Sequence, residues 1–382
     1  MNDTVAQDTP ARLARLQTYV ESDPNNFSLL TETFDCALAL GELKVAQQYL
    51  SRALLLEPTN VFLRHSQATL WIAEKRYTEA EALLQELVDG GVDASAVIFN
   101  LAYVKIRLQK FPEGRDLFSS IKGKPDAPEE STAMLLRCVH HLREFDEAFK
   151  VIEQAMQDKT LDVSAAGVAS LLYLDANQLE QAKRFSEAVL QKDPSHVEAL
   201  VACASVALAE KNPTRAKSLL AQALHQNDQD GRVWSANALA NLLEMNLDRA
   251  LQEFKLAVTY MPGHIGTWHG MAWCNLLRKD LAAAQQNFES AMALDRNFGE
   301  THGGMAVVHA IQGRRLEAEV SIERALRLDP TSLAARYAQG ILSGEATDHK
   351  AFMCFAERVL AGRAKPGGGS LADLLREPGG RN

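Results

Sequence analysis

The chain has 382 residues, of which 47% are hydrophobic and 23% charged, as is usual for a soluble folded protein. Its net charge of −9 disfavours contact with phosphate backbones, so we expect no nucleic-acid partner. No stretch approaches the length of a membrane span, and residues 1–10 do not resemble a secretory signal. Five scattered cysteines, none in a CxxC pair, are typical of buried apolar residues in a reducing compartment, so the expected location is the cytoplasm.

The first predicted element lies within residues 1–26. A polar tail comes first, and apolar residues at helical spacing then predict a helix over residues 11–22. Pro24 ends it, because proline cannot continue a helix. Since this helix has no partner helix next to it in the sequence, we expect it to cap the elements that follow.

From residue 27 onward the sequence repeats with a period of 34 residues. Five prolines are separated by multiples of 34: Pro24, Pro58, Pro194, Pro262 and Pro330. One column at this period holds only small residues: Ala46, Ala80, Gly114, Ala148, Ala182, Ala216, Ala250, Ala284 and Ala318. Within each period the apolar spacing is helical and breaks once, as at Gly41 and Gly313. Such a period predicts an array of helix–turn–helix units.

The seventh and eighth periods show the pattern best. The seventh holds Trp234, Ala238, Ala250, Phe254, Ala257 and Pro262, and the eighth repeats it as Trp268, Ala272, Ala284, Phe288 and Ala291, with Arg296 for the proline. In these residues the chain resembles the tetratricopeptide repeat (TPR) proteins. The resemblance implies an all-α, right-handed superhelical solenoid of about nine repeats over residues 27–332, with capping helices. The repeats would start near residues 27, 61, 95, 129, 163, 197, 231, 265 and 299.

Basic residues gather in the middle of the chain. By resemblance to the family, first helices line a concave groove, which would place Arg107, Arg137 and His141 on one wall. His140 adds to them from a column that otherwise holds leucine, isoleucine and alanine. Such a patch suits a carboxylate or an acidic peptide. The alternative is a solvated face with one tolerated histidine. Repeats three and four, with Gly114 and residues 123–128, are also the expected place for a bend.

An apolar stripe is predicted on the groove-lining helices of repeats seven to nine: Leu239, Leu243, Trp273, Leu277, Val307 and Ile311. Glycine inside a helix costs about 1 kcal/mol against alanine, so Gly270 and Gly304, with Gly266 and Gly303, indicate space left open beside the stripe. The stripe therefore suits a helical or extended peptide. The alternative is packing between repeats.

Catalytic and cofactor motifs are not recognisable in the sequence. Four histidines fall close together, at His264, His269, His302 and His309. His302 and His309 are about 10 Å apart along a helix, too far to share one metal, and we expect packing roles. The chain is therefore expected to be no enzyme and to hold no cofactor or metal.

The C-terminal part is predicted to contain a degenerate capping hairpin over residues 333–362 and a flexible tail over residues 363–382. In the tail, Leu371, Leu374 and Leu375 form a small apolar face that could dock in the chain's own groove; the alternative is a disordered tail.

The function predicted from these patterns is that of a non-enzymatic scaffold or adaptor that binds a protein or peptide segment in its concave groove. The alternative is a chaperone or an accessory module for a secretion or assembly machine or for a partner enzyme. The identity of the partner and the oligomeric state are left open.

Overall fold

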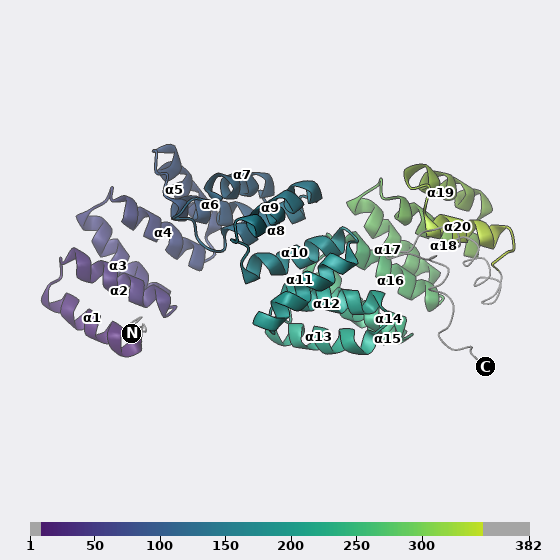
Figure 1. Ribbon diagram of the computed structural model, residues 1–382, viewed down its shortest axis with the longest axis horizontal. Helices are drawn as coiled ribbons and strands as arrows, with labels where there is room; N and C mark the ends of the chain where they lie inside the picture. Colours follow the sequence, from purple (N-terminus) through teal and green to yellow (C-terminus); the bar gives the residue numbers. More distant parts are fainter. Residues whose placement is uncertain (1–8, 347–382) are drawn as a thin grey trace. The chain divides into compact units, whose positions relative to one another are not determined.

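The structure is a computed structural model that describes residues 9–346, and every regular element in this part is an α-helix (Figure 1). Nine hairpins, each with a first helix A and a second helix B, lie between α1 (Pro10–Ser22) and α20 (Leu333–Leu342) in these residues. The A helices are α2 (Phe27–Ala39), α4 (Val61–Ala73), α6 (Ser95–Arg107), α8 (Ser131–His141), α10 (Val163–Asp175), α12 (Val197–Ala209), α14 (Gly231–Leu243), α16 (Ile265–Leu277) and α18 (Gly299–Ile311). The B helices are α3 (Leu43–Leu56), α5 (Tyr77–Asp89), α7 (Phe111–Ile121), α9 (Phe145–Gln157), α11 (Leu179–Lys192), α13 (Pro213–Gln226), α15 (Leu247–Tyr260), α17 (Leu281–Leu294) and α19 (Arg315–Leu328). The predicted all-α solenoid class is confirmed, and the right-handed superhelix stays a prediction.

Small side chains allow the helices of the hairpins to pack closely. The column of small residues that runs from Ala46 to Ala318 is buried at all nine positions. The column twelve residues earlier, from Phe34 to Ala306, is buried as well. Small residues at fixed helical sites let two backbones approach, where larger ones would overpack. The columns found in the sequence are therefore the contact positions of the helices.

Each A helix of the nine hairpins is followed by a residue in the left-handed backbone conformation. These residues are 34 apart, with φ between 59° and 75°: Gly41, Lys75, Gln109, Arg143, Asn177, Lys211, Met245, Lys279 and Gly313. The next N–H closes the turn, as when Glu42 donates to the carbonyl of Ala37 at 2.9 Å. The predicted break at the two glycines is confirmed. Six of the other seven positions carry side chains that make this conformation unfavourable, whereas the asparagine at Asn177 tolerates it.

Replacing Lys211 with glycine should raise the free energy of unfolding by about 1 kcal/mol, because the left-handed conformation is unfavourable for lysine and not for glycine. Gly313→Ala should lower the free energy of unfolding by a similar amount. A Cβ at Gly313 would meet no atom within 4 Å, so this variant tests the backbone conformation alone. Urea unfolding followed by circular dichroism measures both. Shifts of the same sign in the two variants would contradict this account.

A side chain near the start of four A-type helices bonds to the turn before its own helix. In each case the donor lies six residues after the carbonyl that accepts. The pairs are Trp234 with Asp228 (2.7 Å), Trp268 with Pro262 (2.8 Å), His302 with Arg296 (2.8 Å) and Arg336 with Pro330 (3.2 Å). His302 thus takes the place of a tryptophan as a buried hydrogen-bond donor, in agreement with its expected packing role.

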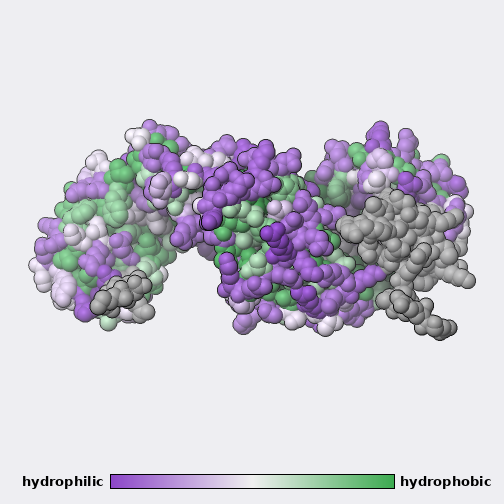
Figure 2. Space-filling view, in the orientation of Figure 1, coloured by the Kyte–Doolittle hydropathy of each residue, from purple (hydrophilic) through white to green (hydrophobic). Residues whose placement is uncertain are grey.

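The described helices form two compact units, one ending at Asp193 and the other beginning at Pro194. In the first unit, the largest buried cluster surrounds Phe118 and Leu136; in the second, Phe254 of α15 and Phe288 of α17 are the largest buried side chains. Hydrophilic residues cover most of the surface seen in Figure 2. None of the helices within residues 9–346 combines the length and the hydropathy that a membrane crossing requires.

The connection between α7 and α8 is longer than the others, at residues 122–130. Both flanking helices have 11 residues, whereas the other A and B helices have 13 or 14. Gly114 lets α7 approach α6 closely, because a Cβ there would lie 3.1 Å from Cγ1 of Ile106 and 3.3 Å from the carbonyl of Ala102. The 34-residue period is kept through this junction, because the shorter helices compensate for the longer connection. The bend at this junction stays a prediction.

Candidate partner-binding groove

Four large aliphatic side chains are exposed on three consecutive A helices of the second unit. Leu239 and Leu243 of α14 are 40% and 54% exposed, Leu277 of α16 is 48% exposed, and Ile311 of α18 is 45% exposed. Because α14 contacts α16 and α16 contacts α18, these side chains lie on neighbouring helices. Of the six residues predicted for the apolar stripe, only these four are exposed, and the name apolar stripe refers to these four from here on. Single exposed leucines are ordinary, but an aligned set on adjoining helices is typical of a protein-binding surface.

Two residues predicted for this surface contribute less or not at all. Trp273 is half-buried, and its ring meets the edge of Phe288 with centroids 6.2 Å apart. Val307 has no exposed area, because α20 packs against α18 and Ala338 joins the buried cluster that contains Val307. The expectation that Val307 lines the groove is wrong.

The glycines predicted to open the groove are filled by neighbouring rings. A Cβ at Gly270 would lie 2.5 Å from Cζ of Phe254, and one at Gly304 would overlap the ring of Phe288. Each glycine therefore lets an A helix rest directly on a phenyl ring of the preceding B helix. The expectation of an open floor at Gly270 and Gly304 is wrong, and both are packing positions.

Gly303 and Gly266 do not leave open space beside the stripe either. A Cβ at Gly303 would lie 2.8 Å from Oγ of Ser332 and 2.9 Å from Cβ of Ala334, so this glycine allows α20 to approach α18. A Cβ at Gly266 would meet only the ring of its own neighbour His264, at 3.0 Å. The candidate surface therefore depends on its exposed side chains and not on missing ones.

His269 of α16 packs among aromatic rings beside the groove. Its ring centroid lies 5.4 Å from that of Phe288 and 5.4 Å from that of Phe298, and Nε2 is 2.8 Å from Oγ1 of Thr301. Burial lowers the pKa of His269 to about 4, so the imidazole is neutral at pH 7. Within residues 9–346, no three side chains of histidine, cysteine, aspartate or glutamate come together as a metal site would require.

A buried carboxylate between α14 and α15 was not predicted from the sequence. Glu253 is 5% exposed and accepts hydrogen bonds from Nδ2 of Asn237 at 2.9 Å and of Asn241 at 2.6 Å. Nε of Arg249 donates to it at 3.0 Å. A buried carboxylate is tolerated only with such partners, so this network ties α14 to α15. Asparagine recurs one period apart, at Asn241 and Asn275, and this recurrence in the sequence could have indicated a repeated position of the fold that holds a buried polar side chain. Both are buried and do not line the groove.

The two predicted histidines of the first unit pair with their neighbours. Nε2 of His140 lies 2.7 Å from Oδ2 of Asp175, which connects α8 to α10. The ring of His141 stacks on Phe111 with centroids 3.5 Å apart. Burial, together with the neighbouring His140, lowers the pKa of His141. His140 therefore breaks the aliphatic column because it exchanges an apolar contact for a polar one between hairpins.

The two predicted arginines likewise contact local groups. The guanidinium of Arg107 lies over the ring of Tyr77, 5.4 Å from its centroid. Nη1 of Arg137 lies 3.4 Å from Sδ of Met134. Since each of the four basic residues has a partner in its own unit, their role as a patch for acidic peptides stays a prediction.

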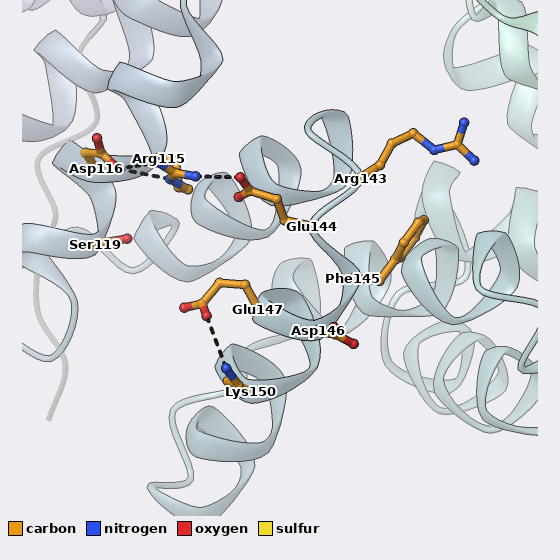
Figure 3. Close-up of a pocket in the computed structure, with 9 residues that line it drawn as sticks. All are labelled: Arg115, Asp116, Ser119, Arg143, Glu144, Phe145, Asp146, Glu147 and Lys150. Atoms are coloured by element: carbon orange, nitrogen blue, oxygen red, sulfur yellow. Dashed lines mark hydrogen bonds and ion pairs between the residues drawn. The ribbon is translucent and has the colours of Figure 1, made fainter. Parts of the chain in front are cut away.

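A cavity of about 770 Å³ lies on the first unit at α7 and α9 (Figure 3). Charged groups of both signs line it, among them Arg115, Asp116, Glu144, Glu147 and Lys150. Nη1 of Arg115 is 2.6 Å from Oε1 of Glu144, and Nη2 is 2.8 Å from Oδ1 of Asp116. Because Glu144 belongs to the turn before α9, the first of these ion pairs links two hairpins. This ion pair therefore contributes to the contact between the two hairpins.

Comparison with known proteins gives matches in fold. A family model described as a tetratricopeptide repeat matches residues 173–242. The human IFIT1 dimer with m7Gppp-AAAA is 14% identical with a TM-score of 0.57, and the match covers 93% of this chain and 91% of that one. A monomeric mutant of IFIT1 with m7Gppp-AAAA is 13% identical with a TM-score of 0.58, over 92% of this chain and 91% of that one. A tetratricopeptide repeat protein from Parabacteroides merdae is 15% identical with a TM-score of 0.45, over 66% of this chain and 98% of that one. No curated protein matches the chain.

The identities of 13% and 14% to the IFIT1 structures show a shared fold and nothing more specific. The helical hairpins, their 34-residue period and the matching family model agree with one another. The chain therefore has the fold of a tetratricopeptide repeat protein, and its residues 173–242 match the model of that family.

Proposed function

We propose that this chain is a non-enzymatic scaffold or adaptor that binds a segment of a partner protein on the apolar stripe. The observation that carries the proposal is the alignment of Leu239, Leu243, Leu277 and Ile311, each 40–54% exposed, on three adjoining helices. Burying a whole leucine contributes about 1.5–3 kcal/mol, so covering four half-exposed side chains contributes about 3–6 kcal/mol. That corresponds to a Kd between about 6 mM and 0.04 mM, which suits a reversible contact.

A protein segment fits this surface better than a nucleic acid does. The IFIT1 structures hold m7Gppp-AAAA, whereas this chain has a net charge of −9 and its candidate surface is aliphatic. An amphipathic segment with two or three apolar anchors, helical or extended, would cover the stripe.

The proposal extends to the organisation of the chain. Each hairpin would be one repeat, α1 would cap the first, and residues 333–362, of which α20 is the regular described part, would cap the last. Four cysteines, Cys36, Cys138, Cys203 and Cys274, are buried and form no disulfide within the described residues, which supports a reducing compartment such as the cytoplasm.

Leu277→Asp should weaken partner binding at least tenfold, because a carboxylate placed in the stripe must be desolvated by the bound segment. Leu316→Asp is the matched control, since Leu316 is 76% exposed on α19, a B helix outside the stripe. Proteins captured from the native cell by the wild-type chain are identified by mass spectrometry and then titrated against both variants. Partners that bind the wild type and both variants equally would overturn the assignment.

A further inference from the structure

We propose that the apolar stripe is occupied, in the absence of a partner, by residues 370–376 of the same chain. The inference rests on the proposed function, because it takes the stripe as the binding surface. The segment reads Ser370-Leu371-Ala372-Asp373-Leu374-Leu375-Arg376 and lies outside the described residues. A tethered occupant would make the surface self-inhibited, so that a partner must displace it.

The length and the starting point of the remaining chain allow this contact. The described part ends at Ala346, just after α20, and α20 packs against α18, the last helix of the stripe. Residues 347–370 then lead to Leu371. Because residues 333–362 are proposed to form the capping hairpin, the linker is residues 363–370, which would span up to about 28 Å when extended. Neighbouring helices are about 8–10 Å apart, so α16 lies about 20 Å from α20 and α14 about 30 Å. The segment therefore reaches the whole stripe.

The chemistry of the segment matches that of the stripe. Leu371, Leu374 and Leu375 are spaced i, i+3 and i+4, which would place them on one face of a helical turn. The stripe presents three leucines and one isoleucine. Asp373 and Arg376 balance each other, so the segment brings no net charge to an uncharged surface. Aliphatic groups on both sides can thus exclude water together.

Tethering makes a weak contact effective. A short flexible linker holds its ligand at an effective concentration of about a millimolar. For a segment with a Kd of about 0.1 mM, in the range that the stripe supports, competition at that concentration weakens an outside ligand about tenfold. The inhibition is moderate, so a partner of micromolar affinity still binds.

The test uses a fluorescein-labelled peptide of residues 367–378 and the full-length chain. Fluorescence anisotropy should give a Kd about tenfold lower for the double variant Leu371→Asp, Leu374→Asp than for the wild type, because the variant has lost its own competitor. Adding Leu277→Asp to the double variant should remove the binding, whereas adding Leu316→Asp should leave it unchanged. Equal affinity for wild type and double variant, no measurable binding to the double variant, or binding that survives Leu277→Asp would overturn the proposal.

A second copy of the chain is the competing source of the segment. Sedimentation of the wild type across a hundredfold range of concentration should show a constant monomer. Dimers that dissociate in the Leu371→Asp, Leu374→Asp variant would replace self-docking with exchange between copies and overturn the intramolecular proposal.

Failure of this inference is separable from failure of the proposed function. If the peptide does not bind but a captured partner is lost on Leu277→Asp, the stripe binds partners and the tail does not use it. If the peptide binds as expected and capture shows no stripe-dependent partner, self-docking stands and the adaptor role falls.

Discussion

Gly304→Ala should lower the free energy of unfolding of the second unit by about 2 kcal/mol. The added methyl group would overlap the ring of Phe288, which is fully buried and has no space to move into. Overpacking of this kind costs up to about 3 kcal/mol, and the better helix propensity of alanine returns about 1 kcal/mol. Urea unfolding measures the difference. Gly263→Ala, in the turn before α16, is a control for the clash alone, since a Cβ there would meet nothing within 4 Å, and it should change the stability by less than about 0.5 kcal/mol.

A double-mutant cycle with Phe288→Leu identifies the cause. The smaller side chain should destabilise the wild type by leaving a cavity and should do so less in the Gly304→Ala background, because the methyl group then has room. Two costs that simply add would show that the clash with this ring is not responsible.

Acidification from pH 7 to pH 5 should cost the second unit about 2 kcal/mol through His269. The pKa of this side chain is lowered by burial to about 4 in the folded chain, against about 6.5 when unfolded. Between these two values the unfolded chain binds more protons than the folded chain does. Stability is therefore lost as the pH falls through 6.5 and continues to fall until about pH 4.

His269→Gln removes this titration while keeping an amide that can bond to Oγ1 of Thr301. The variant should be less stable than the wild type at pH 7, and the gap should close as the pH is lowered to 5. The free energy of unfolding is measured at steps of half a pH unit for both proteins. Parallel profiles would mean that His269 does not titrate between pH 5 and 7.

The hairpins could be predicted because their signals lie close together in the chain. A column of small residues marks where two helices meet, and the break at Gly41 or Gly313 marks the turn between them. The same backbone conformation and the same turn hydrogen bond recur where lysine or methionine replaces glycine. The turn therefore does not require glycine, and the 34-residue period can be recognised at positions that lack it.

The candidate site was predicted only in part, because exposure depends on what packs against a residue from elsewhere. Leu239 and Leu277 are exposed, whereas Val307, in the same column as Leu239, is covered by α20. A missing side chain can leave space or admit a neighbour, and the sequence of one helix does not say which. A signal existed: Gly270 and Gly304 each follow a consensus phenylalanine, Phe254 or Phe288, by 16 residues.

The close pairing of α18 with α20, which Gly303 permits, gives the apolar stripe two unlike ends. At one end α18 is held closely by α20, whereas at the other end α14 and the neighbouring A helix α12 touch through far fewer groups. A region with few contacts opens at a lower free energy than a densely packed one. We therefore expect the α14 end of the stripe to move when a bulky segment binds, while the α18 end stays rigid.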